Sequence, residues 1–219
     1  MLPPMPGPVA LVGAGEFLAP MIEIDRGLLE ATGRGRPRVV ILPTASARDG
    51  DRTFRTWADM GVEHFTALGA EVEPVLVRTV SDGFDAAALQ AVGEADLVYL
   101  SGGDPRHLVE VLLGSPLGAA IAMANARGAV IAGCSAGAMA IVGRSMAFRS
   151  IPKLRFPLPL PIRWMAGLGL AEGVAVLPHY DAWPEPFSAL IALQAPRAVT
   201  VLGIDEETAA VGRGGAWQV

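Results

Sequence analysis

Seven short apolar runs, each ending in turn residues, constrain most strongly what this chain can fold into. Most of them are continuously apolar rather than alternating, which is the pattern of strands buried on both faces of a sheet. Between several of these runs lie segments with apolar residues near the 3.6-residue spacing of a helix. The predicted strands lie within residues 9–15, 38–46, 71–77, 95–103, 128–137, 173–179 and 198–205.

Alternating strands and helices predict βαβ units, and hence an α/β fold with a mostly parallel central sheet and helices on both faces. The predicted helices cover residues 51–68, 85–92, 106–113 and 116–126. A chain of 219 residues, 52% of them hydrophobic, is long enough to bury a large core. We therefore expect a single domain over residues 1–219.

One segment, residues 149–169, departs from this rhythm because it contains four prolines and four basic residues. Proline at that density excludes a regular helix or a central strand. The segment is interpreted as an excursion from the domain. Two alternatives remain open, a plain surface loop and a flap close to the functional site.

Composition excludes several classes of protein. The net charge is −5 and the basic residues are scattered, so no nucleic-acid partner is indicated. A single cysteine excludes an intrachain disulfide, and the His and Cys content offers no metal-ligand cluster. The amino-terminal segment lacks the positive flank of a signal peptide, and the uncharged stretches fall short of the ~20 residues that a membrane span needs. We expect a cytoplasmic protein without cofactor or membrane partner, and the apolar excess permits a homodimer.

Residues 133–137 read Gly-Cys-Ser-Ala-Gly, a G-x-S-x-G motif between a predicted strand and a predicted helix. This is the context of a nucleophile elbow, whose sharp turn exposes the central serine and requires small neighbours. The start of the helix would point backbone N–H groups at negative charge formed at Ser135. Ser135 is therefore a candidate nucleophile; the alternative is tight strand–helix packing in which Ser135 bonds local backbone. Cys134, one position off the centre, is interpreted as a buried apolar residue.

A nucleophilic serine needs a base, and the chain has three histidines. His179 ends an apolar run, which places it at the edge where open parallel sheets bind their ligands. It is the candidate general base, with a structural role as the alternative. His64 lies within a predicted amphipathic helix and His107 opens another, so a structural or surface role is favoured for both.

A pair of glycines, Gly102 and Gly103, ends the apolar run at residues 95–103. Their backbone N–H groups are free of side-chain obstruction. Together with the N–H of Ala136, the residue after the candidate nucleophile, they could hold the oxyanion of a tetrahedral intermediate. The alternative is a simple strand-to-helix turn in which Asp104 is the N-cap.

Six motifs are spread over most of the chain: PTAS (43–46), SGGD (101–104), GCSAGAM (133–139), GLGL (167–170), PH (178–179) and GIDEETA (203–209). In this order, they resemble the motifs of the serine peptidase family that contains aspartyl dipeptidase and cyanophycinase. The resemblance covers most of the chain and implies a class I glutamine amidotransferase-like fold. It implies Ser135 as nucleophile, His179 as general base, and Gly103 and Ala136 as oxyanion donors through their N–H groups. Of these motifs, PTAS and GIDEETA are more similar to those of cyanophycinase than to those of the dipeptidase.

The acid that would orient His179 has three candidates. In the dipeptidase this acid lies between the serine and the histidine, an interval in which this chain has one carboxylate, Glu172. Asp181 lies two residues after His179 and could face the same site if the chain stays extended there. Glu206 follows another predicted strand end and could approach from a neighbouring strand. Glu206 is preferred to Asp181, and Glu172 is third.

The resulting hypothesis is a serine peptidase that attacks an amide carbonyl and forms an acyl-enzyme. By resemblance, the substrates are small peptides, with aspartyl or β-aspartyl peptides as a family expectation. Two alternatives remain open. An esterase or amidase would use the same residues, and a non-catalytic binding or scaffold protein would explain the lack of an acid at the dipeptidase position.

Overall fold

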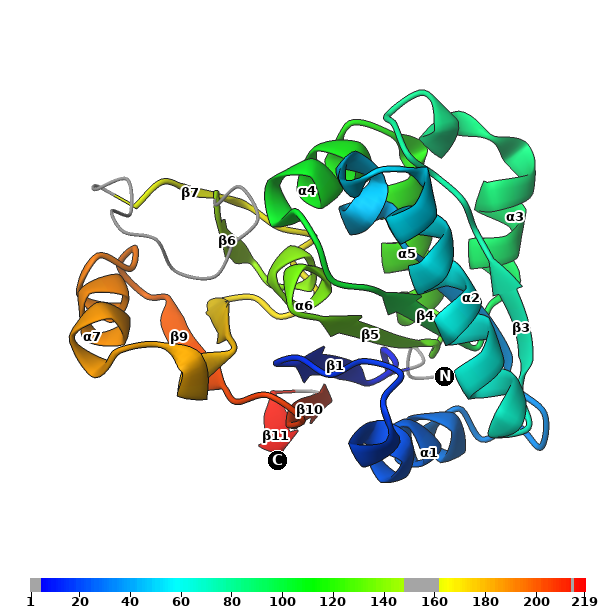
Figure 1. The fold of residues 1–219 in the computed structure, drawn as a ribbon, viewed down its shortest axis with the longest axis horizontal. Coiled ribbons are helices and arrows are strands. Elements are labelled where there is room, and N and C mark those ends of the chain that lie inside the picture. Colours follow the sequence, from blue (N-terminus) through cyan, green and yellow to red (C-terminus); the bar gives the residue numbers. More distant parts are fainter. Residues whose placement is uncertain (1–4, 148–161, 214) are drawn as a thin grey trace.

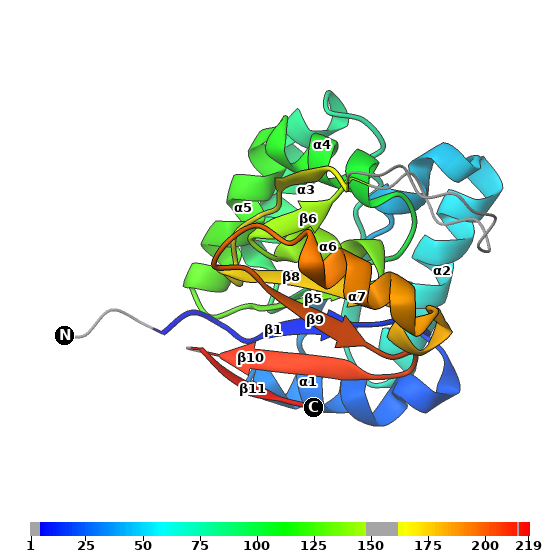
Figure 2. The same ribbon diagram turned by 90° about the vertical axis from the view of Figure 1, so that its left-hand side faces the viewer.

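The computed structural model describes residues 5–147, 162–213 and 215–219. The strands in these ranges are β1 Val9–Val12, β2 Arg38–Leu42, β3 Glu71–Pro74, β4 Leu97–Leu100, β5 Val130–Cys134, β6 Arg144–Met146, β7 Trp164–Ala166, β8 Val174–Pro178, β9 Thr200–Ile204, β10 Ala209–Arg213 and β11 Ala216–Gln218. Five of them form a parallel sheet in the order β1, β5, β4, β2 and β3 (Figure 1). Beyond β1 the sheet continues with antiparallel β10 and β11 (Figure 2). The predicted α/β fold with a mostly parallel sheet is confirmed.

Helices cover both faces of this sheet. The α-helices are α1 Ile22–Ala31, α2 Asp51–Ala67, α3 Ala86–Glu94, α4 Pro105–Leu113, α5 Pro116–Ala126, α6 Ala136–Ile141 and α7 Glu185–Leu193. Side chains of α1 and α2 share one core cluster with the sheet, and side chains of α3, α4, α5 and α6 share a second on the other face. No single helix in the described ranges is long and apolar enough to cross a membrane; α4 and α5 meet that test only as a pair, on length and composition, with an 86° bend between them.

The continuous apolar runs follow from this double coverage. In β1, Val9 and Leu11 join the core cluster under α3 to α6, whereas Ala10 and Val12 join the cluster under α1 and α2. Successive side chains of a strand point to opposite faces, so a strand covered on both faces must be apolar at every position. β3 is the exception because it lies at the edge of the sheet, and its glutamates are exposed.

Two of the predicted strands lie outside the central sheet. β8 and β9 pair with each other in parallel and form a separate two-stranded sheet. A third core cluster joins this region to α6 through Met139, Leu177 and Trp183. Trp183 also stacks on Phe187 of α7, with ring centroids 4.4 Å apart. The packing of this small unit against α6 therefore sets the position of the residues at the ends of β8 and β9.

Some elements differ from the prediction. Most predicted strands end several residues earlier in the structure, because turn residues follow them; residues Thr44–Asp49, for example, form a 3-10 helix. Helices α1 and α7 and strands β10 and β11 were not predicted, since their apolar patterns are short. Of the excursion at 149–169, residues 149–161 lie outside the described residues, whereas Trp164–Ala166 pairs antiparallel with β6 away from the central sheet.

Candidate active site

The G-x-S-x-G motif forms a sharp turn between β5 and α6. Ser135 joins the two elements with φ 50° and ψ −108°, a conformation that is strained for a residue with a side chain. The flanking glycines are required by close packing. A Cβ on Gly133 would lie 2.4 Å from the carbonyl carbon of Gly137, and a Cβ on Gly137 would lie 2.1 Å from the carbonyl oxygen of Leu100. The strand, turn and helix thus hold Ser135 at the carboxyl end of the sheet.

Ser135 lies at one end of a chain of hydrogen bonds that passes through His179. The Oγ of Ser135 is 3.0 Å from Nε2 of His179, and Nδ1 of His179 is 2.6 Å from a carboxylate oxygen of Glu206. The Nδ1–H donates to this carboxylate, which leaves the lone pair of Nε2 to accept the serine hydroxyl proton. A neutral imidazole in this tautomer has the arrangement of a general base.

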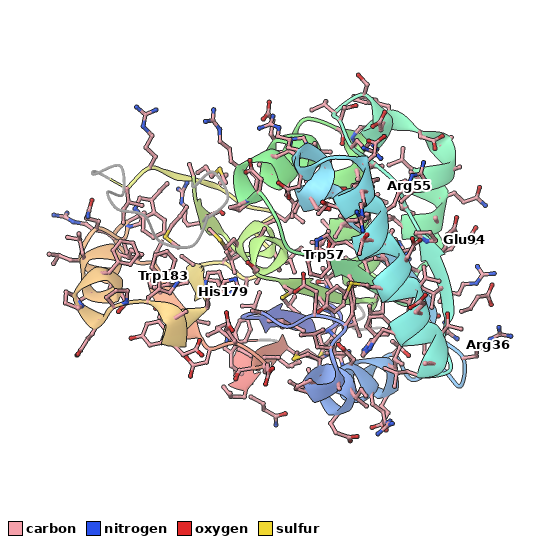
Figure 3. The ribbon with its side chains drawn as sticks, in the orientation of Figure 1. Arg36, Arg55, Trp57, Glu94, His179 and Trp183 are labelled. Carbon is pink, nitrogen blue, oxygen red and sulfur yellow. The ribbon has the colours of Figure 1, made fainter. Side chains whose placement is uncertain are left out.

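The register of β8 and β9 explains how two residues distant in sequence meet. Pro178 is aligned with Ile204 in the parallel pair, so His179 and Glu206 both lie just beyond the same ends of the two strands. His179 adopts a left-handed conformation, with φ 53° and ψ 39°, as the chain turns away from β8. Figure 3 shows His179 between the α7 region and the central sheet, close to Trp183.

The other two candidate acids occupy different places. A carboxylate oxygen of Asp181 accepts a hydrogen bond from the backbone N–H of Glu206, at 3.0 Å. Asp181 thus contacts Glu206 rather than the imidazole. Glu172 lies before β8, at the opposite end of that strand from His179. Of the three candidates, Glu206 is the one whose carboxylate is hydrogen-bonded to His179 in the part of the chain that the structure describes.

The turn after β4 lies directly beside Ser135. Gly103 has φ 142°, and a Cβ on it would lie 2.5 Å from the carbonyl group of Ala45. The neighbouring N–H of Asp104 donates to that same carbonyl oxygen at 2.8 Å. Within the described residues, the N–H of Gly103 has no acceptor. The N–H of Ala136 lies at the first position of α6, where helical N–H groups have no intrahelical partner.

Asp104 also caps α4, as the alternative reading of this turn proposed. Its side chain accepts a hydrogen bond from the backbone N–H of His107 at 3.0 Å. This N-cap leaves the N–H of Gly103 free, because the cap is formed by the side chain of the next residue, Asp104. His107 itself is buried and bonded through Nε2 to the carbonyl oxygen of Arg78, which gives it a structural role.

A buried carboxylate, Glu16, was not singled out from the sequence. It is 5% exposed and lies in the loop after β1. One carboxylate oxygen accepts the backbone N–H of Gly102 at 2.7 Å, and the other accepts the thiol of Cys134 at 2.7 Å. Cys134 is buried as expected, but it is also a hydrogen-bond donor. Burial and the charge of Glu16 raise the pKa of the Cys134 thiol well above its ordinary value, so the thiol remains protonated.

A second buried carboxylate, Asp25, accounts for His64. The Nε2 of His64 is 2.8 Å from a carboxylate oxygen of Asp25, which is fully buried between α1 and α2. Burial raises the pKa of Asp25 above its usual 3.8, and the hydrogen bond to His64 opposes part of that rise. His64 is therefore held by a structural partner on the face of the sheet under α1 and α2.

Replacing Asp25 by Asn is expected to change how stability depends on pH. The folded protein binds the proton of Asp25 more tightly than the unfolded chain, so this residue favours folding most below pH 3.8 and less as the pH rises through the folded-state pKa. The free energy of unfolding of the wild type minus that of Asp25→Asn should fall over this range. Urea unfolding of both proteins across the acid range measures it; a difference that stays constant or rises with pH would contradict the assignment.

The described residues contain no group of three His, Cys, Asp or Glu side chains that could hold a metal ion. The polar side chains near Ser135 are His179, Glu206 and Glu16. His179 is hydrogen-bonded to Ser135 and Glu206, and Glu16 accepts from Gly102 and Cys134. The chemistry available at this site is proton transfer to and from a serine hydroxyl, next to backbone N–H groups that could receive an anion.

Comparison with known proteins gives matches over almost the entire chain. The model of peptidase family S51 matches residues 10–219. The crystal structure of a peptidase from an acI-B1 Actinobacterium is similar at 30% sequence identity and a TM-score of 0.82, covering 98% of this chain and 87% of that one. A peptidase E-type protein from Listeria monocytogenes EGD-e, at 17% identity and a TM-score of 0.67, shares the fold over 97% of each chain.

Proposed function

The chain belongs to peptidase family S51 and is a serine-type peptidase, and from that premise we propose that it cleaves small peptides with Ser135, His179 and Glu206 as its catalytic triad. The observation that carries the proposal is the continuous hydrogen-bond chain from Ser135 through His179 to Glu206, which begins on a strained strand–turn–helix. Nucleophile, base and orienting acid in this order form the arrangement by which serine hydrolases activate a hydroxyl.

In the acylation step, the Oγ of Ser135 attacks the carbonyl carbon of the scissile amide while Nε2 of His179 takes the hydroxyl proton. Glu206 holds the imidazole in the tautomer that makes this possible and stabilises the imidazolium that results. The protonated His179 then gives the proton to the leaving amine. The C–N bond breaks, and an acyl ester on Ser135 remains.

The charge that develops on the carbonyl oxygen needs donors close to Ser135. We assign this role to the backbone N–H groups of Gly103 and Ala136. In support, the Gly103 N–H has no acceptor within the described residues, and a Cβ on the adjacent Gly102 would lie only 3.5 Å from Cβ of Ser135. Preorganised N–H groups of this kind lower the barrier because they need no reorientation when the charge forms.

Deacylation reverses the roles of the same groups. A water molecule replaces the departed amine, and His179 removes its proton as the water attacks the ester carbonyl. The tetrahedral intermediate again places its oxyanion beside Gly103 and Ala136. Collapse of the intermediate returns the proton to Oγ of Ser135 and releases the new carboxylic acid.

A non-catalytic role would have been favoured by the lack of a suitable acid between Ser135 and His179. The hydrogen bond from His179 to Glu206, which follows His179 in the chain, supports an enzyme instead. As substrates we propose small peptides, and among them aspartyl or β-aspartyl peptides, on the strength of family membership.

A digest of a defined peptide mixture tests the proposed substrate class. The mixture holds di-, tri- and longer peptides, with α- and β-aspartyl members and matched peptides in which Asn replaces Asp. Mass spectrometry of the products should show cleavage of short peptides by the wild type, enriched in the aspartyl members, and none by Ser135→Ala. Hydrolysis of activated esters by the wild type with no peptide cleaved would overturn the substrate class while leaving the serine mechanism in place.

A further inference from the structure

Glu16 connects the two backbone segments that carry the proposed oxyanion donors. Its carboxylate bonds to the N–H of Gly102, one residue before Gly103, and to the thiol of Cys134, two residues before Ala136. These segments follow different strands, β4 and β5, and no other residue in the described ranges bonds through its side chain to both of them. One buried side chain thus spans the two halves of the proposed oxyanion hole.

The hydrogen bond between the N–H of Gly102 and Glu16 controls the conformation of the Gly102–Gly103 turn. Because the N–H of Gly102 is already bonded to Glu16 at 2.7 Å, it cannot serve as an oxyanion donor, and the N–H of Gly103 is left for that role. The bond also fixes the orientation of the peptide plane just before that of Gly103. On the other side, the contact of Asp104 with the carbonyl oxygen of Ala45 fixes the following peptide. The orientation of the Gly103 N–H is therefore fixed by hydrogen bonds of the preceding and the following peptide groups.

The hydrogen bond between the thiol of Cys134 and Glu16 acts at the start of the nucleophile elbow. Cys134 is the last residue of β5, and its thiol is fully buried against Glu16. The raised pKa of the thiol keeps it protonated, so it remains a donor to the carboxylate. Because a buried carboxylate is costly unless it is hydrogen-bonded, both of its contacts resist displacement of Glu16.

We propose that Glu16 is a positioning residue that sets the distance between the two oxyanion donors by holding Gly102 on one side and Cys134 on the other. This inference rests on the proposed function, because it assumes that Gly103 and Ala136 receive the oxyanion. Glu16 touches neither the substrate nor Ser135 through a hydrogen bond in this scheme. It acts through the backbone, and a misplacement of about 1 Å at a reacting centre can cost about 10²-fold in rate.

The rate at which a fluorophosphonate probe labels the protein tests this role without knowledge of the natural substrate. As Oγ of Ser135 attacks the phosphorus, His179 takes the hydroxyl proton and fluoride leaves. Negative charge builds up on the phosphoryl oxygen during this step, as it does on the carbonyl oxygen of a peptide in the proposed mechanism. Glu16→Ala removes the hydrogen bonds to Gly102 and Cys134 and should slow labelling of Ser135 by about 10- to 100-fold. Glu16→Gln keeps an acceptor for Gly102 and a polar group for Cys134, so it should label within about threefold of the wild-type rate, whereas loss of one oxyanion donor outright costs about 10²–10³-fold.

Two further variants separate positioning from loss of stability. Asp25→Asn alters another buried carboxylate, one that contacts His64 instead of the oxyanion segments, and should label at the wild-type rate whatever its melting temperature. Glu16→Asp keeps the charge but shortens the side chain, so it cannot reach both partners, and should label about tenfold more slowly. It replaces Glu16→Ala if that variant does not fold.

The outcomes are distinct. Slow labelling of Glu16→Ala and Glu16→Asp, with near wild-type rates for Glu16→Gln and Asp25→Asn, supports the positioning role. Wild-type rates for both Glu16→Ala and Glu16→Asp, or equal slowing of Glu16→Gln and Glu16→Ala, would overturn it and leave the triad intact. If the wild type itself is never labelled at Ser135, the proposed function fails, and the positioning role fails with it.

Discussion

Replacement of Ser135 by Ala is expected to abolish catalysis, with a loss in turnover of about 10⁶-fold on the best peptide from the mixture. The hydroxyl supplies the attacking oxygen, and Ala at this position leaves His179 with no proton to remove. Residual activity of ~10³- to 10⁴-fold over water is expected from the oxyanion donors and from substrate binding. Steady-state rates of the wild type and the variant, measured on the same peptide, give the ratio.

The buried environment of Cys134 supplies a matched control. Cys134→Ser places a second hydroxyl next to Ser135 in the sequence but keeps a donor for Glu16, so it should retain most of the activity. Rescue of Ser135→Ala by the native Cys134 thiol is not expected, because this thiol is buried and points to Glu16. A Ser135→Ala variant that turns over within tenfold of the wild type would contradict the assignment of the nucleophile.

The second large effect is expected at Glu206. Glu206→Gln removes the charge that stabilises the imidazolium, and its amide can hold the imidazole of His179 in the wrong tautomer. In serine proteases whose acid is buried, the corresponding change lowers turnover by about 10⁴-fold. The side chain of Glu206 is 48% exposed, so solvent screens part of its charge, and a loss of about 10³-fold in turnover is expected here. The kcat of the wild type and of Glu206→Gln, measured on the same peptide, gives the ratio.

Variants of Asp181 test whether Glu206 or Asp181 is the acid that orients the imidazole of His179. Asp181→Asn keeps an acceptor for the backbone N–H of Glu206, so its turnover should stay within about threefold of the wild type, since surface substitutions of this kind have small effects. Asp181→Ala removes that acceptor and should cost more than Asp181→Asn but far less than Glu206→Gln. A larger loss for Asp181→Asn than for Glu206→Gln would assign the orienting acid to Asp181 instead.

The fold could be predicted from the sequence where burial on both faces of a strand produced a continuous apolar run. Strands β1, β2, β4 and β5 were predicted for this reason, and the exposed edge strand β3 was predicted from its shorter run. Helices α2, α3, α4 and α5 were predicted from apolar residues near the 3.6-residue spacing, and the ends of all these elements were wrong by a few residues. The pairing of β8 with β9 outside the central sheet could not be predicted, because β8 has the same apolar pattern as a central strand. Strands β10 and β11 are short and lie at the edge, where one-sided burial leaves a weak pattern.

The candidate site could be predicted where a local motif constrains the backbone. Ser135, Gly103 and Ala136 lie in turns that need small residues in a fixed order, so the sequence points to them directly. The contact between His179 and Glu206 depends instead on the register of two strands, and residues 27 positions apart meet only once that register is known. Glu16 was missed because its partners, a backbone N–H and a thiol, leave no recognisable spacing; an acidic residue in the turn after the first apolar run was the available signal.

The most direct test of the central claim, an activated serine at the β5–α6 turn, is fluorophosphonate labelling followed by mass-spectrometric mapping of the modified residue. The account predicts that the wild-type protein is labelled at Ser135 and that His179→Ala, folded to the same extent by circular dichroism, is labelled at least about 10³-fold more slowly because the base is gone. Label found on another residue, or labelling of Ser135 that is unchanged in His179→Ala, would contradict it.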